Sequence, residues 1–148
     1  MPNNKISPTT IKTQVAKEIF ALNGERPNVA IVIVGENHKY LKNVKKLEKE
    51  AKEVGVDTHL YVCDEDISEE DLNKIINLFN EDDLIDAIYI QKPLSSVFNS
   101  DDLFNLIKFE KQIDSESDLS EQDLEIFEAN FFKNVLENYK ERNLLIKN

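Results

Sequence analysis

The chain has 148 residues, and its 29 acidic residues outnumber its 18 lysines and arginines to give a formal net charge of −11. This length suits a single domain, 1–148, whose core needs neither metals nor disulfides. Because neutralising phosphates takes clustered basic residues, the charge argues against nucleic acid as a partner. A single cysteine, Cys63, excludes an internal disulfide and a thiolate zinc site, and it predicts a buried, inert thiol in a reducing setting.

The chain carries no sign of membrane insertion or export. No stretch approaches the roughly 20 consecutive apolar residues that span a bilayer. The first twenty residues lack the basic segment followed by an apolar segment that is typical of a signal peptide. We therefore expect a cytoplasmic protein with no membrane partner.

Helical and strand patterns alternate along the first two thirds of the chain. In chain order, they predict a helix over 7–22, a strand over 29–34, a helix that ends at Gly55, a strand over 57–63, a helix opened by a capping box at Ser68, and a strand over 85–91. The strand 29–34 has no polar alternation, which predicts burial on both faces as in a parallel sheet. The three strands then form a βαβαβ unit.

The last third of the sequence predicts two more helices. A short helix is expected over 101–107, followed by a polar turn region over 108–119 and a second capping box at 120–123. The long helix after it has an apolar stripe formed by Leu124, Phe127, Phe131, Val135 and Tyr139. We expect this stripe to pack on the sheet, with a coiled-coil or subunit contact as the alternative. The predicted fold class is α/β, a three-layer αβα arrangement with a short parallel sheet and a long C-terminal helix.

The third strand runs directly into the polar and proline-containing exit Gln91-Lys92-Pro93-Leu94. Open α/β folds bind ligands at the carboxyl edge of their strands. Gln91 is therefore a candidate ligand contact, although a polar residue at a strand end is an equally good explanation. Gly35-Glu36-Asn37, at the end of the first strand, has the same character.

Five short segments stand in the order and spacing found in one family of folate enzymes. They are 32–37, 53–56, 66–72, 90–94 and 110–114. Over about residues 8–114 the chain resembles the amino-terminal catalytic domain of the bifunctional methylenetetrahydrofolate dehydrogenase/methenyltetrahydrofolate cyclohydrolase family, whereas the tail from Ser115 is unmatched or only loosely matched.

The resemblance implies that any nicotinamide chemistry is lost. In that family a separate Rossmann domain follows and binds NADP. Here the only glycines are Gly24, Gly35 and Gly55, so the chain has no G-x-G-x-x-G phosphate turn. We expect no cofactor and no dehydrogenase half-reaction from this polypeptide.

The resemblance also locates the acid–base pair of the cyclohydrolase reaction. The family places a Tyr and a Lys four residues apart on the helix after the first strand, on one helix face. Counting without gaps from Gly35 puts Asn43 at the Tyr position and Leu47 at the Lys position. No catalytic residue is therefore identified. Leu47 is expected to be a core residue, and compensation by Tyr40, Lys45 or Lys46 is the alternative.

The resemblance implies that Gln91, Pro93, Leu94 and Asp114 match residues that the family uses for binding. Together with Asn43, which stands at the family Tyr position, they form the candidate substrate-binding set. The family match implies that Asp114 accepts two hydrogen bonds from the pterin edge, although an ordinary surface acid is the alternative. Neither His38 nor His59 has the spacing of a metal ligand, and no metal site is expected.

Two functions remain open at this point. The first is a degenerate relative of the folate enzyme that binds a tetrahydrofolate derivative or another protein, or associates with itself, without turnover. The second is a residual methenyltetrahydrofolate cyclohydrolase that uses displaced groups.

Overall fold

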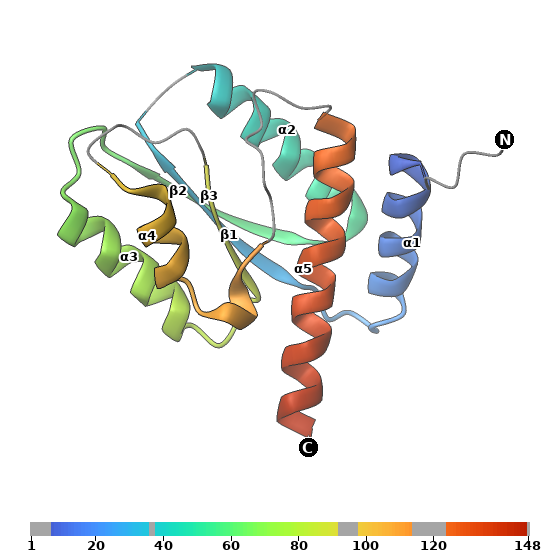
Figure 1. Ribbon diagram of the computed structural model, residues 1–148. Coiled ribbons are helices and arrows are strands. Elements are labelled where there is room, and N and C mark those ends of the chain that lie inside the picture. The colour runs from blue at the N-terminus through green and yellow to red at the C-terminus, as the bar shows by residue number, and fades with distance from the viewer. Residues whose placement is uncertain (1–6, 36–37, 92–97, 114–123, 148) are drawn as a thin grey trace, which may run out of the picture.

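The computed structural model describes residues 7–35, 38–91, 98–113 and 124–147. Its elements are α1 (Pro8–Phe20), β1 (Asn28–Val34), α2 (His38–Val54), β2 (Asp57–Cys63), α3 (Glu69–Glu81), β3 (Ala87–Ile90), α4 (Ser100–Leu106), the 3₁₀ helix η1 (Phe109–Lys111) and α5 (Leu124–Lys147), as Figure 1 shows. Within these ranges, no helix combines the length and the apolar character needed to cross a membrane.

Three parallel strands form the sheet in the order β2-β1-β3. The central strand pairs along its whole length with β2, whereas β3 pairs only with Val29–Val32. For this reason β3 is shorter than the predicted span 85–91. The flanking N–H groups of Asp86 and Gln91 still donate to carbonyls of β1, each at 2.9 Å. The βαβαβ unit predicted from the sequence is confirmed.

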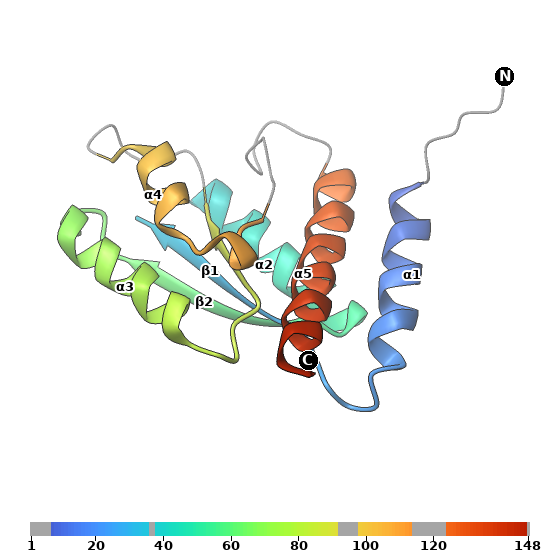
Figure 2. The same ribbon diagram turned by 60° about the horizontal axis from the view of Figure 1, so that its bottom comes forward.

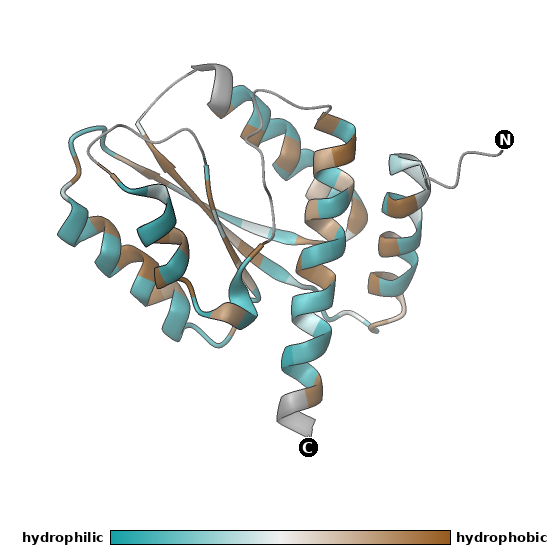
Figure 3. Ribbon diagram, viewed as in Figure 1, coloured by the Kyte–Doolittle hydropathy of each residue, from teal (hydrophilic) through white to brown (hydrophobic). Residues whose placement is uncertain are grey.

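Helices cover both faces of the sheet and complete the predicted three layers. Figures 1 and 2 show α3 and α4 on one side and α1, α2 and α5 on the other. Alternate residues of β1 serve the two cores: Val29, Ile31 and Ile33 pack with α1, α2 and α5, and Ala30 and Val32 pack with α3 and α4. In Figure 3 β1 is hydrophobic along its length, as expected of a strand buried on both faces.

Local capping chemistry fixes the helix ends. The Ser68 hydroxyl accepts a hydrogen bond from Asp71 N at 3.1 Å, which confirms the predicted N-cap of α3. Helix α1 ends at Phe20, two residues earlier than predicted, and the chain then turns through Asn23 at a φ of 59°. Gly55 ends α2 at a φ of 100°, where a Cβ would lie 2.7 Å from the Ile19 side chain. The second capping box, at 120–123, lies outside the described residues.

Helix α5 packs on the sheet, as its stripe predicts. The ring of Tyr89 on β3 lies edge-on to Phe127 and Phe131, with centroids 5.8 and 5.3 Å away. Phe132 and Leu136, beside the stripe, are also buried. The helix therefore fills the space between the sheet and α1, and the coiled-coil alternative is not needed to explain the stripe.

Candidate functional site

The carboxyl ends of β1 and β3 form the topological switch point of the sheet. From β1 the chain leaves through α2 on one face to reach β2, and it returns through α3 on the other face to β3. At such a point the two connections diverge and leave a crevice, where ligands of open α/β folds bind. The residues that end β1 and β3 are therefore the first candidates for contact with a ligand.

Gln91 lies at this edge, directly after β3. Its backbone N–H donates to Val32 O at 2.9 Å, which fixes the residue beside the end of β1. The side chain is only 3% exposed. An amide buried at the switch point offers both a donor and acceptors to a polar ring system. The sequence-predicted candidate thus lies where the fold would use it.

Gly35 turns the chain away from the end of β1. Its φ of 86° lies in the left-handed region, which a side chain would disfavour. Its N–H donates to Cys63 O at 2.9 Å, which holds this turn against the end of β2. The Cys63 thiol is buried, as predicted, and burial raises its pKa, which disfavours the reactive thiolate.

The two family positions on α2 differ in their surroundings. Leu47 has no exposed surface and belongs to the core between the sheet, α1, α2 and α5. Asn43, one turn earlier, is half-buried. The expectation that Leu47 is a core residue is confirmed, because its side chain packs with Val44 and Ala51 in that core. A charged amine at position 47 would have to enter this apolar layer.

Lys46, the neighbour of Leu47, belongs to an ion cluster that joins three helices. Its Nζ lies 2.9 Å from Oε1 of the fully buried Glu128 on α5. Lys12 of α1 contacts the same oxygen at 3.4 Å and Glu50 of α2 at 3.4 Å. Burial alone would lower the pKa of Lys46, but the hydrogen bond and charge of Glu128 outweigh it and raise that pKa. The amine is therefore held protonated.

Other predicted site residues cannot be located. Pro93, Leu94 and Asp114 lie outside the described residues, as do the side chains of His38 and Tyr40. Their roles stay predictions. Among the residues that the structure describes, no group of three or more His, Cys, Asp or Glu is arranged to hold a metal ion.

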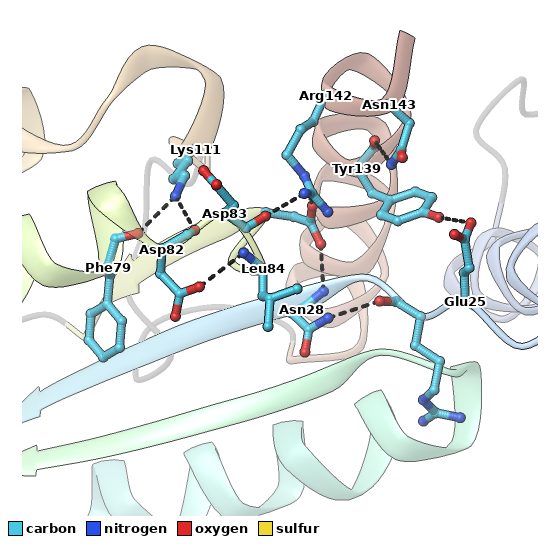
Figure 4. A network of polar contacts seen from close by, with 12 residues as sticks. Glu25, Asn28, Phe79, Asp82, Asp83, Leu84, Lys111, Tyr139, Arg142 and Asn143 are labelled. Atoms are coloured by element: carbon cyan, nitrogen blue, oxygen red, sulfur yellow. Dashed lines mark hydrogen bonds and ion pairs between the residues drawn. The ribbon is translucent and has the colours of Figure 1, made fainter. Parts of the chain in front are cut away.

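A second polar region lies at the opposite, amino edge of the sheet (Figure 4). The buried carboxylate of Asp86 accepts from Asn28 N at 2.7 Å and from Arg142 Nε of α5 at 2.6 Å. Arg142 also donates to Asp83 O. Burial raises the pKa of Asp86, and the bonds from Asn28 and Arg142 only partly oppose this.

Hydrogen bonds from two further residues, Lys111 and Tyr139, extend this amino-edge network. Lys111 of η1 donates to three carbonyls at the end of α3, those of Phe79, Asn80 and Asp82, at 2.8, 2.8 and 2.7 Å. The Tyr139 hydroxyl donates to Glu25 at 2.5 Å. Burial, aided by Glu25, raises the pKa of Tyr139 to about 12. No sequence motif predicts this network, because its residues lie far apart in the chain.

The fold and the site define a parallel α/β domain with a candidate ligand-binding edge at its switch point. A model of the tetrahydrofolate dehydrogenase/cyclohydrolase catalytic domain matches residues 4–114. The chain belongs to this family.

Curated relatives and solved structures agree with this assignment. The bifunctional protein FolD of Listeria innocua is 34% identical over 86 residues, 57% of this chain and 30% of the relative. That of Flavobacterium johnsoniae is 36% identical over 95 residues, 62% of this chain and 32% of the relative. This chain thus spans about a third of the length of these relatives.

The fold is similar to parts of larger enzymes. A 5,10-methylenetetrahydrofolate dehydrogenase from the silkworm, Bombyx mori, superposes with a TM-score of 0.68 at 31% identity, over 72% of this chain and 38% of that one. The FolD methylenetetrahydrofolate dehydrogenase/cyclohydrolase from Campylobacter jejuni gives 0.67 at 27% identity, over 72% and 39%.

Proposed function

We propose that this chain binds a tetrahydrofolate derivative at the carboxyl edge of β1 and β3 and does not hydrolyse methenyltetrahydrofolate at an enzymatic rate. Family membership and the relatives' names motivate the ligand. The observation that carries the loss of turnover is the complete burial of Leu47, at the position where the family resemblance puts the catalytic lysine. The proposal includes no nicotinamide cofactor, because this sequence has no G-x-G-x-x-G turn.

Neither Asn43 nor Leu47 of α2 can act as the general acid or base of the cyclohydrolase reaction. Cyclohydrolase chemistry needs a group that moves a proton at the reacting carbon, and such a group contributes about 10²–10⁴-fold to the rate. Leucine moves no proton, and the amide of Asn43 is a poor substitute for a phenol. The α2 positions that match the family pair therefore support binding rather than turnover.

The displaced-group alternative depends, within the described side chains, chiefly on Lys46. Its amine is bonded to Glu128 and its pKa is raised, so it holds its proton against transfer. A lysine that acts as a base needs the opposite shift. This observation disfavours residual cyclohydrolase activity through Lys46.

Binding is supported by the position of Gln91. Its buried amide at the switch point matches the family glutamine and offers hydrogen bonds to a folate head group. Pro93, Leu94 and Asp114 remain predicted contacts of the same ligand, with Asn43 on the facing helix.

Titration calorimetry with tetrahydrofolate tests the ligand. We expect saturable binding to the wild type and at least tenfold weaker binding to Gln91→Met, which keeps the volume and removes the amide. Gln14→Met, on the exposed face of α1, is the matched control and should bind as the wild type does. Absence of binding at millimolar tetrahydrofolate would contradict the proposal.

A methenyltetrahydrofolate hydrolysis assay tests turnover. We expect the wild type to give no rate above the buffer reaction. A catalysed rate that Lys46→Met abolishes would instead establish the displaced-group cyclohydrolase. Thermal unfolding of the same samples shows that the variant is folded.

A further inference from the structure

We propose that Asn23-Gly24, in the turn between α1 and β1, is a site of spontaneous covalent modification. Asn23 deamidates there through a cyclic imide to aspartate and isoaspartate, and isoaspartate at this position loosens the attachment of α5. The site lies at the amino edge of the sheet, away from the switch point. It does not rest on folate binding.

Asn23 is the only asparagine of this chain that a glycine follows, because valines precede the other two glycines, Gly35 and Gly55. A backbone nitrogen attacks the side-chain amide of the preceding asparagine most easily when its own residue has no side chain, as in glycine. The space is also open, since a Cβ built on Gly24 would meet no atom within 4 Å. The nitrogen of Gly24 is therefore the least hindered nucleophile of this kind in the sequence.

Both reacting groups are available in the folded chain. Asn23 and Gly24 are exposed. Neither the Asn23 side-chain amide nor the Gly24 N–H makes a hydrogen bond to any residue that the structure describes. The bonds that flank the turn are long, from Asn23 N to Phe20 O and from Glu25 N to Leu22 O, each 3.4 Å. A turn held so weakly opens locally, without unfolding of the helix and strand that it joins.

The reaction needs only water in addition to these two residues. The nitrogen of Gly24 bonds to Cγ of Asn23, the bond from Cγ to Nδ2 breaks, and ammonia leaves with the proton of the Gly24 N–H. Water then opens the imide at either carbonyl. Opening at the side-chain carbonyl gives aspartate in a normal backbone. Opening at the backbone carbonyl gives isoaspartate, in which the main chain runs through Cγ.

The two products differ in what they do to the turn. Asn23 and Gly24 have positive φ values of 59° and 96°. Aspartate tolerates this left-handed region as asparagine does, so the normal-backbone product keeps the turn. Isoaspartate adds a methylene to the main chain between Leu22 and Glu25, whose hydrogen bond spans the turn. Isoaspartate is therefore the disruptive product.

The turn also positions Glu25, which ties α5 to this end of the sheet. The Glu25 carboxylate accepts the hydrogen bond of the Tyr139 hydroxyl at 2.5 Å (Figure 4). Asn23 lies two residues before Glu25, and both line one hollow of about 810 Å³ beside α1 and the end of α2. An extra main-chain atom so close to Glu25 displaces its carboxylate from Tyr139. The attachment of α5 is weakened as a result.

Other asparagines are held by hydrogen bonds of their side chains. Asn99, which precedes Ser100, caps α4, and its side-chain oxygen accepts from Asp102 N at 3.1 Å. Asn28 donates from its side chain to Arg26 O at 2.9 Å. These residues are internal references for the rate at Asn23.

Peptide mapping by mass spectrometry of the full chain, incubated in mildly alkaline buffer, tests the site. We expect Asn23 to deamidate at least tenfold faster than Asn99, and faster still as the pH rises, because the attacking nitrogen must lose its proton. Isoaspartyl methyltransferase, which methylates isoaspartate and not aspartate, distinguishes the products. In urea the same incubation gives the rate of the unfolded chain, and we expect the folded chain to react within tenfold of that rate.

Variants separate the chemistry from the structure. Asn23→Gln lengthens the side chain, so that cyclisation needs a larger ring, and Gly24→Ala adds a methyl group beside the attacking nitrogen. We expect each change to lower the rate at position 23 at least tenfold. Asn130→Gln, at an exposed position of α5, is the matched control and should leave the rate at Asn23 unchanged.

Thermal unfolding of fresh and aged protein tests the consequence for α5. We expect the isoaspartate fraction to unfold about 4 °C below the fresh protein, and Asn23→Asp, which copies the other product, to differ by about 1 °C. In Tyr139→Phe the bond to Glu25 is already absent. Ageing of that variant should therefore lower its Tm by less than half as much.

Four results would overturn the proposal. The first two are a rate at Asn23 no higher than at Asn99, and protection of Asn23 by more than tenfold relative to urea. The other two are an isoaspartate fraction that unfolds at the same temperature as Asn23→Asp, and an equal loss on ageing in Tyr139→Phe and the wild type.

Discussion

The two ends of the sheet differ in what their polar groups do. At the carboxyl edge, where open α/β folds bind ligands, Gln91 is a buried amide, and Leu47, at the α2 position that the family resemblance assigns to a lysine, is buried in the core. At the amino edge, Asp86, Arg142 and Tyr139 form a dense network that joins α5 to the sheet. The dense network lies far from the candidate site and serves the fold.

The difference is instructive because perturbed titratable groups commonly mark functional sites. In this protein the pKa values of Asp86 and Tyr139 are both raised, and both groups belong to the amino-edge network. Burial, the first cause of each shift, comes from the packing of α5. The raised pKa values of Asp86 and Tyr139 therefore reflect the packing of α5 against the rest of the protein. The candidate site is identified by the sheet topology instead.

The largest effect is expected at the carboxyl edge, from restoring the family pair. In Asn43→Tyr/Leu47→Lys the new amine enters an apolar core, and we expect a loss of about 4 kcal/mol in the free energy of unfolding. Urea denaturation measures it, with Leu47→Met, expected to lose less than about 1.5 kcal/mol, as the control. A folded double variant that hydrolyses methenyltetrahydrofolate would show that the crevice reaches Leu47.

The next effect tests the amino edge. Arg142→Met leaves the Asp86 carboxylate buried without its cation, and we expect a loss of about 3 kcal/mol by urea denaturation. Arg26→Met, which breaks an exposed pair with Asp57, is the matched control and should cost less than about 1 kcal/mol. Adding Asp86→Asn to Arg142→Met should recover part of the loss. Equal costs for the two arginine variants would refute a structural role for this network.

A pH dependence follows from Tyr139. Its pKa is raised from 10.0 to about 12, so the folded state holds the phenol proton more tightly than the unfolded state does. The resulting stability is present below pH 10 and is lost as the pH rises toward 12, by about 2 kcal/mol between pH 9.5 and 11.5. Tyr139→Phe should lose correspondingly less over this range in urea denaturation. Tyr61→Phe, on the exposed face of β2, should follow the wild type.

The smallest effect on stability is expected for Gln91→Met. A neutral hydrogen bond contributes only about 1 kcal/mol net, so we expect at most that loss. Differential scanning calorimetry measures it. A loss as large as that of Arg142→Met would mean that Gln91 serves the fold, and the contrast between the two edges would fail.

Much of the fold was predictable because short-range patterns encode it. Serine caps, glycine stops and apolar periodicity located α1, α2, α3 and the strands to within about two residues. The apolar stripe of α5 predicted its packing on the sheet. The exact length of β3 was not predictable, since pairing with only four residues of β1 depends on the partner strand.

The candidate site was predictable to a smaller degree. The strand-end position of Gln91 and the family spacing that points to Leu47 were both visible in the sequence, and the core location of Leu47 followed from its stripe. The ion cluster of Lys12, Lys46 and Glu128 was not visible, because its members lie on three helices whose packing no local pattern specifies.

By itself the sequence determined the order of helices and strands, the family, and the absence of a Tyr/Lys pair at the aligned positions, because each of these depends on residues close together or on fixed spacing. Only the tertiary structure decided which charges meet. Helix α5 brings Glu128 to Lys46 at one end and Arg142 to Asp86 at the other, across 82 and 56 residues of chain. The same packing places Glu50 of α2 3.4 Å from Lys12 of α1.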